Sequence, residues 1–501
     1  MGVFNSVKGL APGRSVFDLS WEKKFTCEFG QIIPVLHDNA IPGDIWEIGY
    51  ECLVKTQPMA APIMHPVYIT VHTFFVPLAE LCKVAVKEFS QTFDWEDFIT
   101  GGAAGNDAQS LPVWDVTDNA VGSLWDYLCY PIGVDNANAR PVAFKRWSYG
   151  WIWNEFFRDQ NIDAPIDFTT NEAVLKARWE KDYFTSALPW QLRGVAPSMT
   201  ITITGADRDI TFHDEANAGP FKLQDIASGT MSARLGVEPS PAGGPNDARW
   251  TDPALSGAGV GIADLRLAAS LQRYMELSAR AGARYKEHLL AFFNQDAGDH
   301  RLDRPEYIGG AKDWLVTSEV LQTESSDATT AQGTMTGHGI SVGSGFIGKY
   351  RVKEHGVIMS LFCIRAKTMY HQGIDRQDLQ STRYDFYNPM FAGLAEQEIL
   401  KRELFCDGAH ELAVFGYQGR YDEYRYRPNR VCGDMHATYD MWHLCRQFAA
   451  VPTLNSTFIE VDDREDWKAD NTEAGFMVAF GNKLRVVRPM PFRANPGIGV
   501  L

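Results

Sequence analysis

Segments with the residue pattern of β-strands are spread along almost the whole of this chain, and they limit the folds open to it. The segment from 67 to 76, VYITVHTFFV, alternates for part of its length and then becomes continuously apolar. This pattern is typical of a strand in a buried sandwich sheet. Further strands are expected at 25–36, 45–56, 344–352, 356–364 and 476–487. Because helical segments interrupt them irregularly, the order does not fit a βαβ succession, and the sequence predicts a mainly β sandwich with long insertions.

The spacing of apolar residues predicts three longer helices between these strands. Two are expected at 79–98 and 144–157. The third is expected from Asp264, as its N-cap, to about residue 294.

The sequence predicts an N-terminal arm followed by one main domain, residues 25–501, which carries a large surface insertion. Residues 1–24 are expected to form an N-terminal arm, because Gly9, Pro12 and Gly13 break any helix. Residues from about 196 to 262 are rich in Gly, Ala, Pro and Ser after a hairpin pattern at 200–213, which indicates a variable surface insertion. A further exposed loop is expected at 325–339.

The composition is that of a folded protein with an acidic surface. A chain of 501 residues with 45% hydrophobic and 22% charged residues can bury a large core. The formal net charge of −16 argues against a nucleic-acid coat whose whole surface is basic. Contact with packaged nucleic acid would therefore need a local basic patch and a separate basic partner.

Cysteine usage and hydropathy point to a reducing compartment without membrane insertion. The eight cysteines form no C-x-x-C pair, so a zinc ribbon is not indicated and the thiols are expected to be reduced and mostly structural. The N-terminus has no apolar run of signal-peptide length, and no segment reaches the length of a membrane helix.

Sequence motifs for catalysis are missing. There is no G-x-x-x-x-G-K-[ST], no H-E-x-x-H and no G-x-S-x-G. The sequence contains an acidic cluster whose carboxylate oxygens could bind a divalent cation. It consists of Asp462, Asp463, Glu465 and Asp466. Its spacing is not that of an EF-hand, so a solvated loop is favoured, and we expect no enzyme, no cofactor and no metal. A β-sandwich protein that binds or hydrolyses glycans remains the alternative. The two catalytic carboxylates of a glycoside hydrolase are defined by their distance in space, so the sequence alone does not exclude such a pair.

Seven short phrases rich in aromatic residues and proline follow one another along the chain. They are WIWNEFFRDQN at 151–161, YFTSALPW at 183–190, RPEYIGG at 304–310, TRYDFY at 382–387, EYRYRP at 423–428, PTLNSTF at 452–458 and RPMP at 488–491. Together and in this order they resemble the major capsid proteins of the Microviridae, the small icosahedral single-stranded DNA phages, and most of all the gokushovirus-like branch. The resemblance runs from about residue 25 to residue 491.

The resemblance implies a fold, an assembly and a set of partners. The fold is an eight-stranded antiparallel jelly roll. Sixty copies would form a T=1 icosahedral shell around a circular single-stranded DNA genome, with the insertion at about 196–262 as a surface projection for host attachment. The implied partners are other copies of the chain, packaged single-stranded DNA, a small basic internal protein, a pilot protein, a transient scaffolding protein and a host surface receptor. The implied location is the virion, after assembly in the bacterial cytoplasm.

The stretch from Gly419 to Arg430 is the best candidate for contact with DNA. Arginines can hold phosphates and tyrosine rings can stack on unpaired bases. If the stretch is extended, Arg425 and Arg427 share one face. With a second basic set near the C-terminus, the DNA-contact candidates are Arg420, Tyr424, Arg425, Tyr426, Arg427, Arg430, Arg485, Arg488 and Arg493. The favoured alternative for this stretch is a buried arginine–carboxylate and aromatic network that orders a capsid loop.

Aromatic loops are the candidates for contact between copies, because a closed shell requires complementary patches on every subunit. The candidates are Trp151, Trp153, Phe156, Phe157, Tyr183, Phe184 and Trp190. Their alternative role is to cover the ends of the sandwich core.

Overall fold

The computed structural model describes residues 13–100, 110–133, 140–194, 262–281, 290–294, 304–321, 335–394, 396–409, 412–461 and 464–493. The chain divides into two compact units. The larger unit combines Met1–Arg193 with Glu276–Leu501, and the smaller unit is Gly194–Met275. Within the smaller unit, the described residues are Gly194 and residues 262–275 of one helix.

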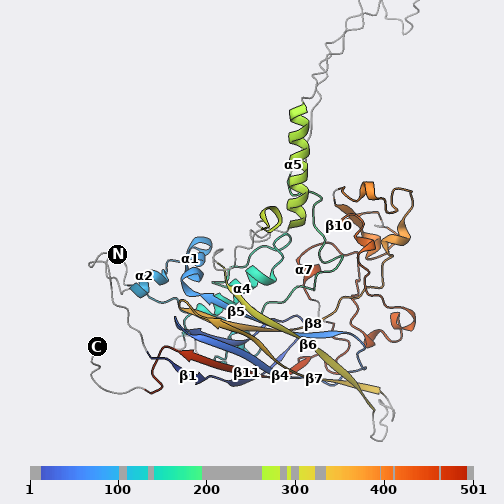
Figure 1. Cartoon of the computed structure of the whole chain (residues 1–501). Coiled ribbons are helices and arrows are strands. Elements are labelled where there is room, and N and C mark those ends of the chain that lie inside the picture. Colours follow the sequence, from blue (N-terminus) through green and yellow to red (C-terminus); the bar gives the residue numbers. More distant parts are fainter. Residues whose placement is uncertain are drawn as a thin grey trace, which may run out of the picture. The chain divides into compact units, whose positions relative to one another are not determined.

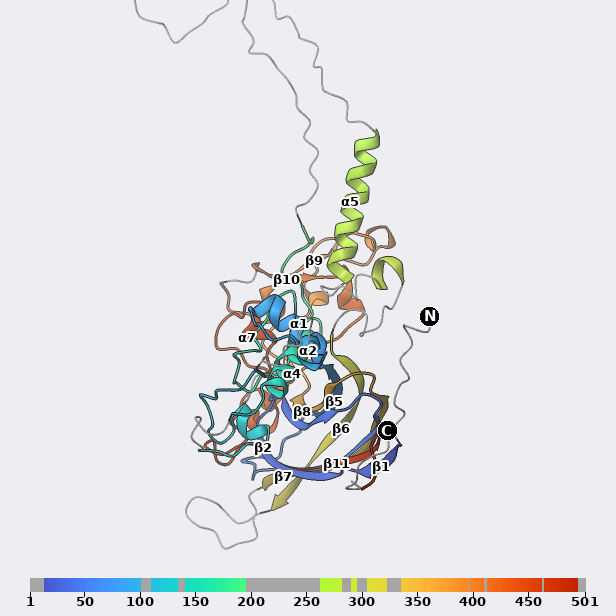
Figure 2. The same ribbon diagram turned by 90° about the vertical axis from the view of Figure 1, so that its left-hand side faces the viewer.

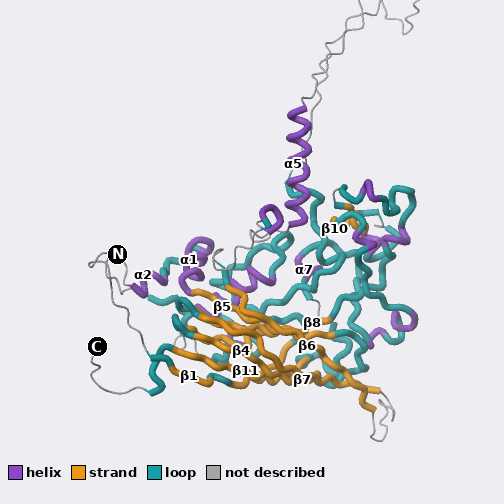
Figure 3. Tube along the Cα trace, viewed as in Figure 1, coloured by secondary structure: helices purple, strands orange, loops and turns teal. Residues whose placement is uncertain are grey.

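One antiparallel sheet forms the body of the larger unit (Figures 1 and 3). Its strands are β1 (Ser15–Asp18), β2 (Trp21–Cys27), β3 (Ile33–Ala40), β4 (Ile45–Thr56), β5 (Val67–Pro77), β6 (Glu306–Leu321), β7 (Met335–Arg351), β8 (Gly356–Ala366) and β11 (Phe476–Arg488). They follow the order β1-β11-β4-β7-β6-β5-β8-β3, and β2 also pairs with β11. Figure 2 shows the sheet curling into a half-barrel. The predicted mainly β, jelly-roll type of fold is confirmed.

Strands β1 and β2 together occupy one position of the sheet, along the edge of β11. Asp18 of β1 faces Arg485, and Trp21 of β2 faces Asn482. Counted as one broken strand, they give the sheet eight positions. This pairing corrects the boundary of the N-terminal arm, since residues 15–18 and 21–24 belong to the sheet. Residues 1–12 lie outside the described part.

The sheet is most deeply buried at β5 and β8. Every residue of β5 is buried except His72, and every residue of β8 except Arg365. On one side, Phe362 of β8 packs against Phe25 and Phe480, with ring centroids 5.4 and 6.0 Å away. On the other side lie the helices α1 (Leu78–Phe89) and α4 (Phe144–Ile152), as Figure 1 shows. Burial on both faces explains why these strands have nearly continuous apolar sequences.

Two side chains connect the ends of the curled sheet. Lys23 Nζ, from β2, donates to the carbonyl oxygen of Pro34 in β3 at 2.7 Å and also to that of Tyr127. Asn482 Nδ2, from β11, donates to the carbonyl oxygen of Val35 at 2.9 Å. The β3–β8 register shifts between Pro34 and Leu36, so these carbonyl groups lie at an irregular point of an edge strand. The two donors satisfy backbone acceptors that the edge leaves without a strand partner.

The remaining elements, apart from the 20-residue helix α5, are short and lie mostly in the loops. The helices are α2 (Trp95–Thr100), α3 (Leu124–Tyr127), α5 (Ile262–Ala281) and α7 (Ser456–Ile459), with a π-helix, η2 (Trp153–Phe157). The 3₁₀ turns are η4 (Arg376–Leu379), η5 (Pro389–Phe391), η6 (Lys401–Glu403), η7 (Asp422–Tyr424), η8 (Gly433–His436) and η9 (Asp440–Trp442). A two-stranded sheet pairs β9 (Gln397–Leu400) with β10 (Val414–Gln418).

Helix boundaries differ from the predicted ones for local reasons. The helix expected at 79–98 ends at Phe89, because Ser90 adopts a left-handed conformation with φ 56°. The helix expected at 144–157 changes to the π form at Trp153. Helix α5 already begins at Ile262, so Asp264 lies in its first turn and is not its N-cap.

Strand predictions were right at β4, β5, β8 and β11, and the strand expected at 344–352 is the second half of β7. The strand expected at 25–36 is two strands, because Gly30, at φ 77°, makes a turn between them. Strand β6 was not predicted, and it contains two consecutive glycines, Gly309 and Gly310, which are uncommon inside strands. A Cβ at Gly309 would lie 2.4 Å from the carbonyl oxygen of Ile347, so glycine here permits close strand packing. Residues 335–339 of the expected loop belong to β7, and the hairpin at 200–213 lies outside the described residues.

All eight cysteines are free thiols, as predicted. Burial raises the pKa of Cys52 and Cys363 to about 11 and that of Cys82 and Cys445 to about 12. Such thiols stay protonated at neutral pH and pack as small apolar groups.

Gly150→Ala should destabilise the chain even though alanine favours helices. A Cβ at Gly150 in α4 would lie 2.5 Å from Phe168 Cβ and 3.1 Å from its Cα. The helix-propensity gain of about 1 kcal/mol is smaller than the overpacking cost of up to about 3 kcal/mol, so we expect a net loss of about 1–2 kcal/mol. Urea unfolding of the unassembled chain measures it. The control Gly393→Ala, where no atom lies within 4 Å, should change the free energy of unfolding by less than about 0.5 kcal/mol. Equal losses in both variants would contradict the packing argument.

Lys23 should make the stability rise with pH in the alkaline range. Burial lowers the pKa of its amine from 10.5 to about 8. Below pH 8 the Lys23 amine is protonated in both the folded and the unfolded chain. Between pH 8 and 10.5 it is protonated to a greater extent in the unfolded chain, so the free energy of unfolding rises with pH. Relative to Lys23→Met, the wild-type chain should gain up to about 3 kcal/mol over this interval, measured by urea unfolding at several pH values. Parallel pH profiles of the two proteins would refute the assignment.

Candidate functional site

The buried carboxylate of Asp182 fixes the conformation of the loop at 183–190, which we call the elbow. Asp182 Oδ1 accepts hydrogen bonds from the backbone amides of Phe184 and Thr185, at 3.0 and 2.7 Å. Asp182 Oδ2 accepts one from the Tyr370 hydroxyl at 2.7 Å. Leu188 then forms an antiparallel bridge with Tyr417 of β10. The elbow therefore ties the loop after β8 to the β9–β10 sheet.

Most of the aromatic side chains predicted to contact neighbouring copies are enclosed by their own chain. Those with at most 6% of their surface exposed are Trp151, Trp153, Tyr183 and Phe184. Their burial argues against contact with another copy. Trp151 and Trp153 pack in the main core of the sheet, whereas Tyr183 and Phe184 belong to a separate apolar cluster that includes Phe415 of β10. The half-buried ones, for which contact with a neighbour stays a prediction, are Phe156, Phe157 and Trp190.

The basic stretch from Gly419 to Arg430 is not extended. Tyr421 has φ 66°, and residues 422–424 form the turn η7. The backbone amides of Arg425 and Tyr426 both donate to the carbonyl oxygen of Asp422, at 2.9 and 3.0 Å. The condition under which Arg425 and Arg427 would share one face is therefore not met, because the chain closes a tight turn at Asp422.

Several arginines of this stretch form local polar contacts, but Arg425 and Arg427 are exposed, so the network is less buried than the favoured alternative expected. Arg425 pairs with Asp422, and Arg430 pairs with Asp375 while donating to the carbonyl oxygen of Gly373 at 2.9 Å. Arg427 is exposed and approaches Gln377 Oε1 at 3.4 Å.

The two tyrosines of the prediction differ in exposure. Tyr424 is 46% exposed, whereas Tyr426 is half-buried, and burial raises its pKa to about 12. Contact of this stretch with DNA remains a prediction.

The C-terminal basic set is spread along β11 and beyond it. Arg485 is exposed and lies 3.4 Å from Glu47. Arg488 pairs with the buried Asp44 at 3.2 Å and stacks on the ring of Trp46. Arg493 is exposed. Arg488 thus has a structural role, while contact of the exposed Arg485 and Arg493 with DNA stays a prediction.

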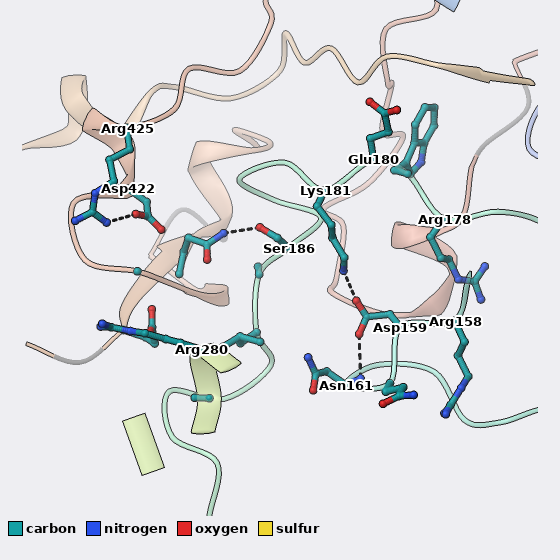
Figure 4. A pocket seen from close by; sticks show the side chains of 18 of the residues that line it. Arg158, Asp159, Asn161, Arg178, Glu180, Lys181, Ser186, Arg280, Asp422 and Arg425 are labelled. Atoms are coloured by element: carbon teal, nitrogen blue, oxygen red, sulfur yellow. Dashed lines mark hydrogen bonds and ion pairs between the residues drawn. The ribbon is translucent and has the colours of Figure 1, made fainter. Parts of the chain in front are cut away.

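A pocket of about 700 Å³ brings together two members of each predicted group of residues. Phe156 and Phe157 line it from one segment, and Arg420 and Arg425 from another more than 260 positions away. The last turn of α5 adds Arg280. Figure 4 shows Arg425 and Asp422 on one side of the cavity and Arg158 and Arg178 on the other.

The pocket lining carries more positive than negative charge. Its cationic side chains are Arg158, Arg178, Lys181, Arg280, Arg365, Arg420 and Arg425, and its carboxylates are Asp159, Glu180, Glu396 and Asp422. Sequence reasoning singled out only Arg420 and Arg425 among these cations. Arg178 and Lys181 lie with Lys176 in one short stretch, but Glu180 and Asp182 offset its charge, so the sequence shows no conspicuous basic cluster there.

The described residues offer no arrangement for metal binding and no helix that could cross a membrane. Among them, no three His, Cys, Asp or Glu side chains gather as metal ligands. In the predicted acidic cluster, Asp466 pairs with Arg464, and Glu465 lies 4.0 Å from Lys468. Asp462 and Asp463 lie outside the described residues. No described helix is long and apolar enough to span a bilayer.

Comparison with known proteins agrees with the sequence resemblance. The family model described as "Capsid protein (F protein)" matches residues 5–498. The capsid protein VP1 of Chlamydia phage 1 is 30% identical over 99% of this chain and 97% of its own length. VP1 of Bdellovibrio phage phiMH2K is 31% identical, covering 91% of this chain and 90% of the relative. VP1 of Spiroplasma virus 4 is 27% identical, covering 99% and 97%. The chain therefore belongs to the phage capsid protein (F protein) family of the Microviridae and is a structural, non-enzymatic capsid protein.

Proposed function

We propose that sixty copies of this chain form a T=1 icosahedral shell that encloses a circular single-stranded DNA genome. The family match carries this proposal. The chain covers 97, 90 and 97% of the lengths of three capsid proteins, so the comparison involves whole subunits. The insertion at about 196–262 is proposed as the projection that attaches to the host receptor, on the strength of the resemblance alone.

An exposed aromatic surface offers a contact for neighbouring copies. It consists of Tyr384, Phe386, Tyr387, Met390 and Tyr424, which are between 46 and 86% exposed. Two of the family phrases, at 382–387 and 423–428, meet here, with the rings of Tyr387 and Tyr424 6.3 Å apart. Aromatic residues and methionine are enriched at protein interfaces, and clustered exposed apolar side chains mark such sites. This surface supports self-assembly better than the buried aromatic loops do.

The charge of the chain supports the proposed partners. With a formal net charge of −16, the shell cannot itself neutralise packaged phosphates, so a small basic internal protein is a proposed partner. A pilot protein, a transient scaffolding protein and a host receptor are proposed from the resemblance. The eight free thiols suit assembly in a reducing bacterial cytoplasm.

Electron microscopy of the phage-derived protein tests the proposed assembly. Uniform icosahedral particles should appear, and their reconstruction should show sixty equivalent copies with DNA inside. Filaments, open lattices or a monodisperse monomer that cleaves glycans would each contradict the proposal.

Phe386→Glu should block assembly and leave the subunit folded. Phe386 is 55% exposed, so a carboxylate there meets water in the free chain but would be desolvated in a subunit interface. A cost of about 2 kcal/mol or more per contact, repeated at every copy, should shift subunits from particles to slowly sedimenting species in velocity sedimentation. The control Val121→Glu changes a 77% exposed side chain on a separate loop and should assemble normally. Normal particles from Phe386→Glu, with unchanged yield, would exclude the aromatic surface as an interface.

A further inference from the structure

Two arginines in the pocket of Figure 4 have no carboxylate partner among the described residues. Arg365, at the end of β8, donates through Nη1 to the carbonyl oxygen of Arg178 at 3.2 Å. Arg420 donates through Nη2 to the carbonyl oxygen of Tyr384 at 3.3 Å. The Nε atom of each is buried and has no hydrogen-bond acceptor. Within the part of the chain that the structure describes, no ion pair involves either guanidinium.

Most of the other cations of the pocket are already neutralised. Lys181 pairs with Asp159, Arg280 with Glu396, and Arg425 with Asp422. Arg178 pairs with Asp163 and Glu460, at 2.8 and 2.7 Å. The excess positive charge of the lining therefore comes largely from Arg365 and Arg420.

Backbone carbonyl groups hold both of these guanidinium groups in place. One terminal nitrogen of each is bonded to the main chain, while Nη2 of Arg365 and Nη1 of Arg420 have no acceptor among the described residues. A guanidinium that is fixed along one edge and unpaired along another is suited to bind the oxygen atoms of a phosphate. Its orientation is set before the ligand arrives, which lowers the entropy cost of binding.

The size and the remaining lining of the cavity fit a phosphate with an attached organic group. A volume of about 700 Å³ lies within the usual range for small-molecule sites. The half-buried rings of Phe156 and Phe157 offer apolar contact, and Gln160 adds an amide. A bare inorganic anion would leave most of this space unfilled.

We propose that this pocket is a phosphate-binding site in which Arg365 and Arg420 are the anion-binding residues and the aromatic rings contact the attached group. The phosphate belongs either to the backbone of single-stranded DNA or to a free nucleotide. The assignment does not depend on a closed shell, because every part of the pocket comes from one chain.

Binding of fluorescein-labelled oligothymidylate to the unassembled full-length chain, followed by fluorescence anisotropy, tests the assignment. Arg365→Gln and Arg420→Gln should each weaken binding by about tenfold, since each removes a charge-assisted hydrogen bond to phosphate. The control Arg351→Gln removes an exposed charge at the end of β7, outside the pocket, and should leave the affinity unchanged. Equal weakening in all three variants, or no weakening in the two pocket variants, would overturn the proposal.

Competition separates the two sources of phosphate. If unlabelled thymidine monophosphate displaces the oligonucleotide, the site takes a free nucleotide. If only unlabelled oligothymidylate displaces it, the site recognises the DNA backbone. Displacement by neither would overturn the proposal.

A second measurement on the wild-type chain guards against misfolded variants. Phenylglyoxal, which reacts with arginine side chains, should modify Arg365 and Arg420 in the free chain, as read by mass spectrometry of peptides. Thymidine monophosphate or oligothymidylate should protect both, and neither should protect Arg351. Unchanged modification of the two pocket arginines in the presence of both ligands would refute the site.

Discussion

The architecture depends on how the two ends of the curled sheet are joined. An antiparallel sheet that curls without closing leaves an edge of unpaired backbone groups at each end. Here the edge strand β3 receives hydrogen bonds from Lys23 of β2 and Asn482 of β11, which come from opposite ends of the chain. Lys23 gives up hydration to do this, and the lowered pKa of its amine measures that cost. With both ends held, the apolar residues between them can fill the main core of the sheet.

The positions of the loops depend on this sheet, because the loops begin and end at strands that the core holds in place. The elbow at 183–190 shows how a loop is joined to the sheet. Asp182 accepts hydrogen bonds from the backbone amide of Phe184 within the loop and from the hydroxyl of Tyr370, which follows β8. The same fixed ends bring Phe156, Arg365 and Arg420 to one pocket. A long loop that carries its own buried carboxylate can be both an ordered structural cover and the wall of a binding site.

Sequence patterns predicted the sheet well where strands are continuously apolar or alternate clearly. Strands β4, β5, β8 and β11 have such patterns, and their bounds differ from the predicted ones by at most two residues. Strand β6 escaped prediction. Its consecutive Gly309 and Gly310 are uncommon inside strands, and only the closeness of Ile347 explains why glycine is needed there. The helix at 79–98 was too long because a left-handed Ser90 leaves no signature in the apolar spacing. Local patterns report burial, but they do not report close contacts between distant strands.

The pocket shows that local sequence patterns are equally limited in predicting functional residues. An interleaved run such as Arg425, Tyr426 and Arg427 is conspicuous in a sequence, yet Asp422 closes it into a turn and pairs with Arg425. Arg365, by contrast, has no charged neighbour along its buried strand and acquires its setting only when the chain folds. The effective charge of an arginine is set by the carboxylates within a few ångströms, and these come from other segments. A chain with an overall charge of −16 can therefore carry a cationic pocket, because the field inside a cavity depends on its own lining.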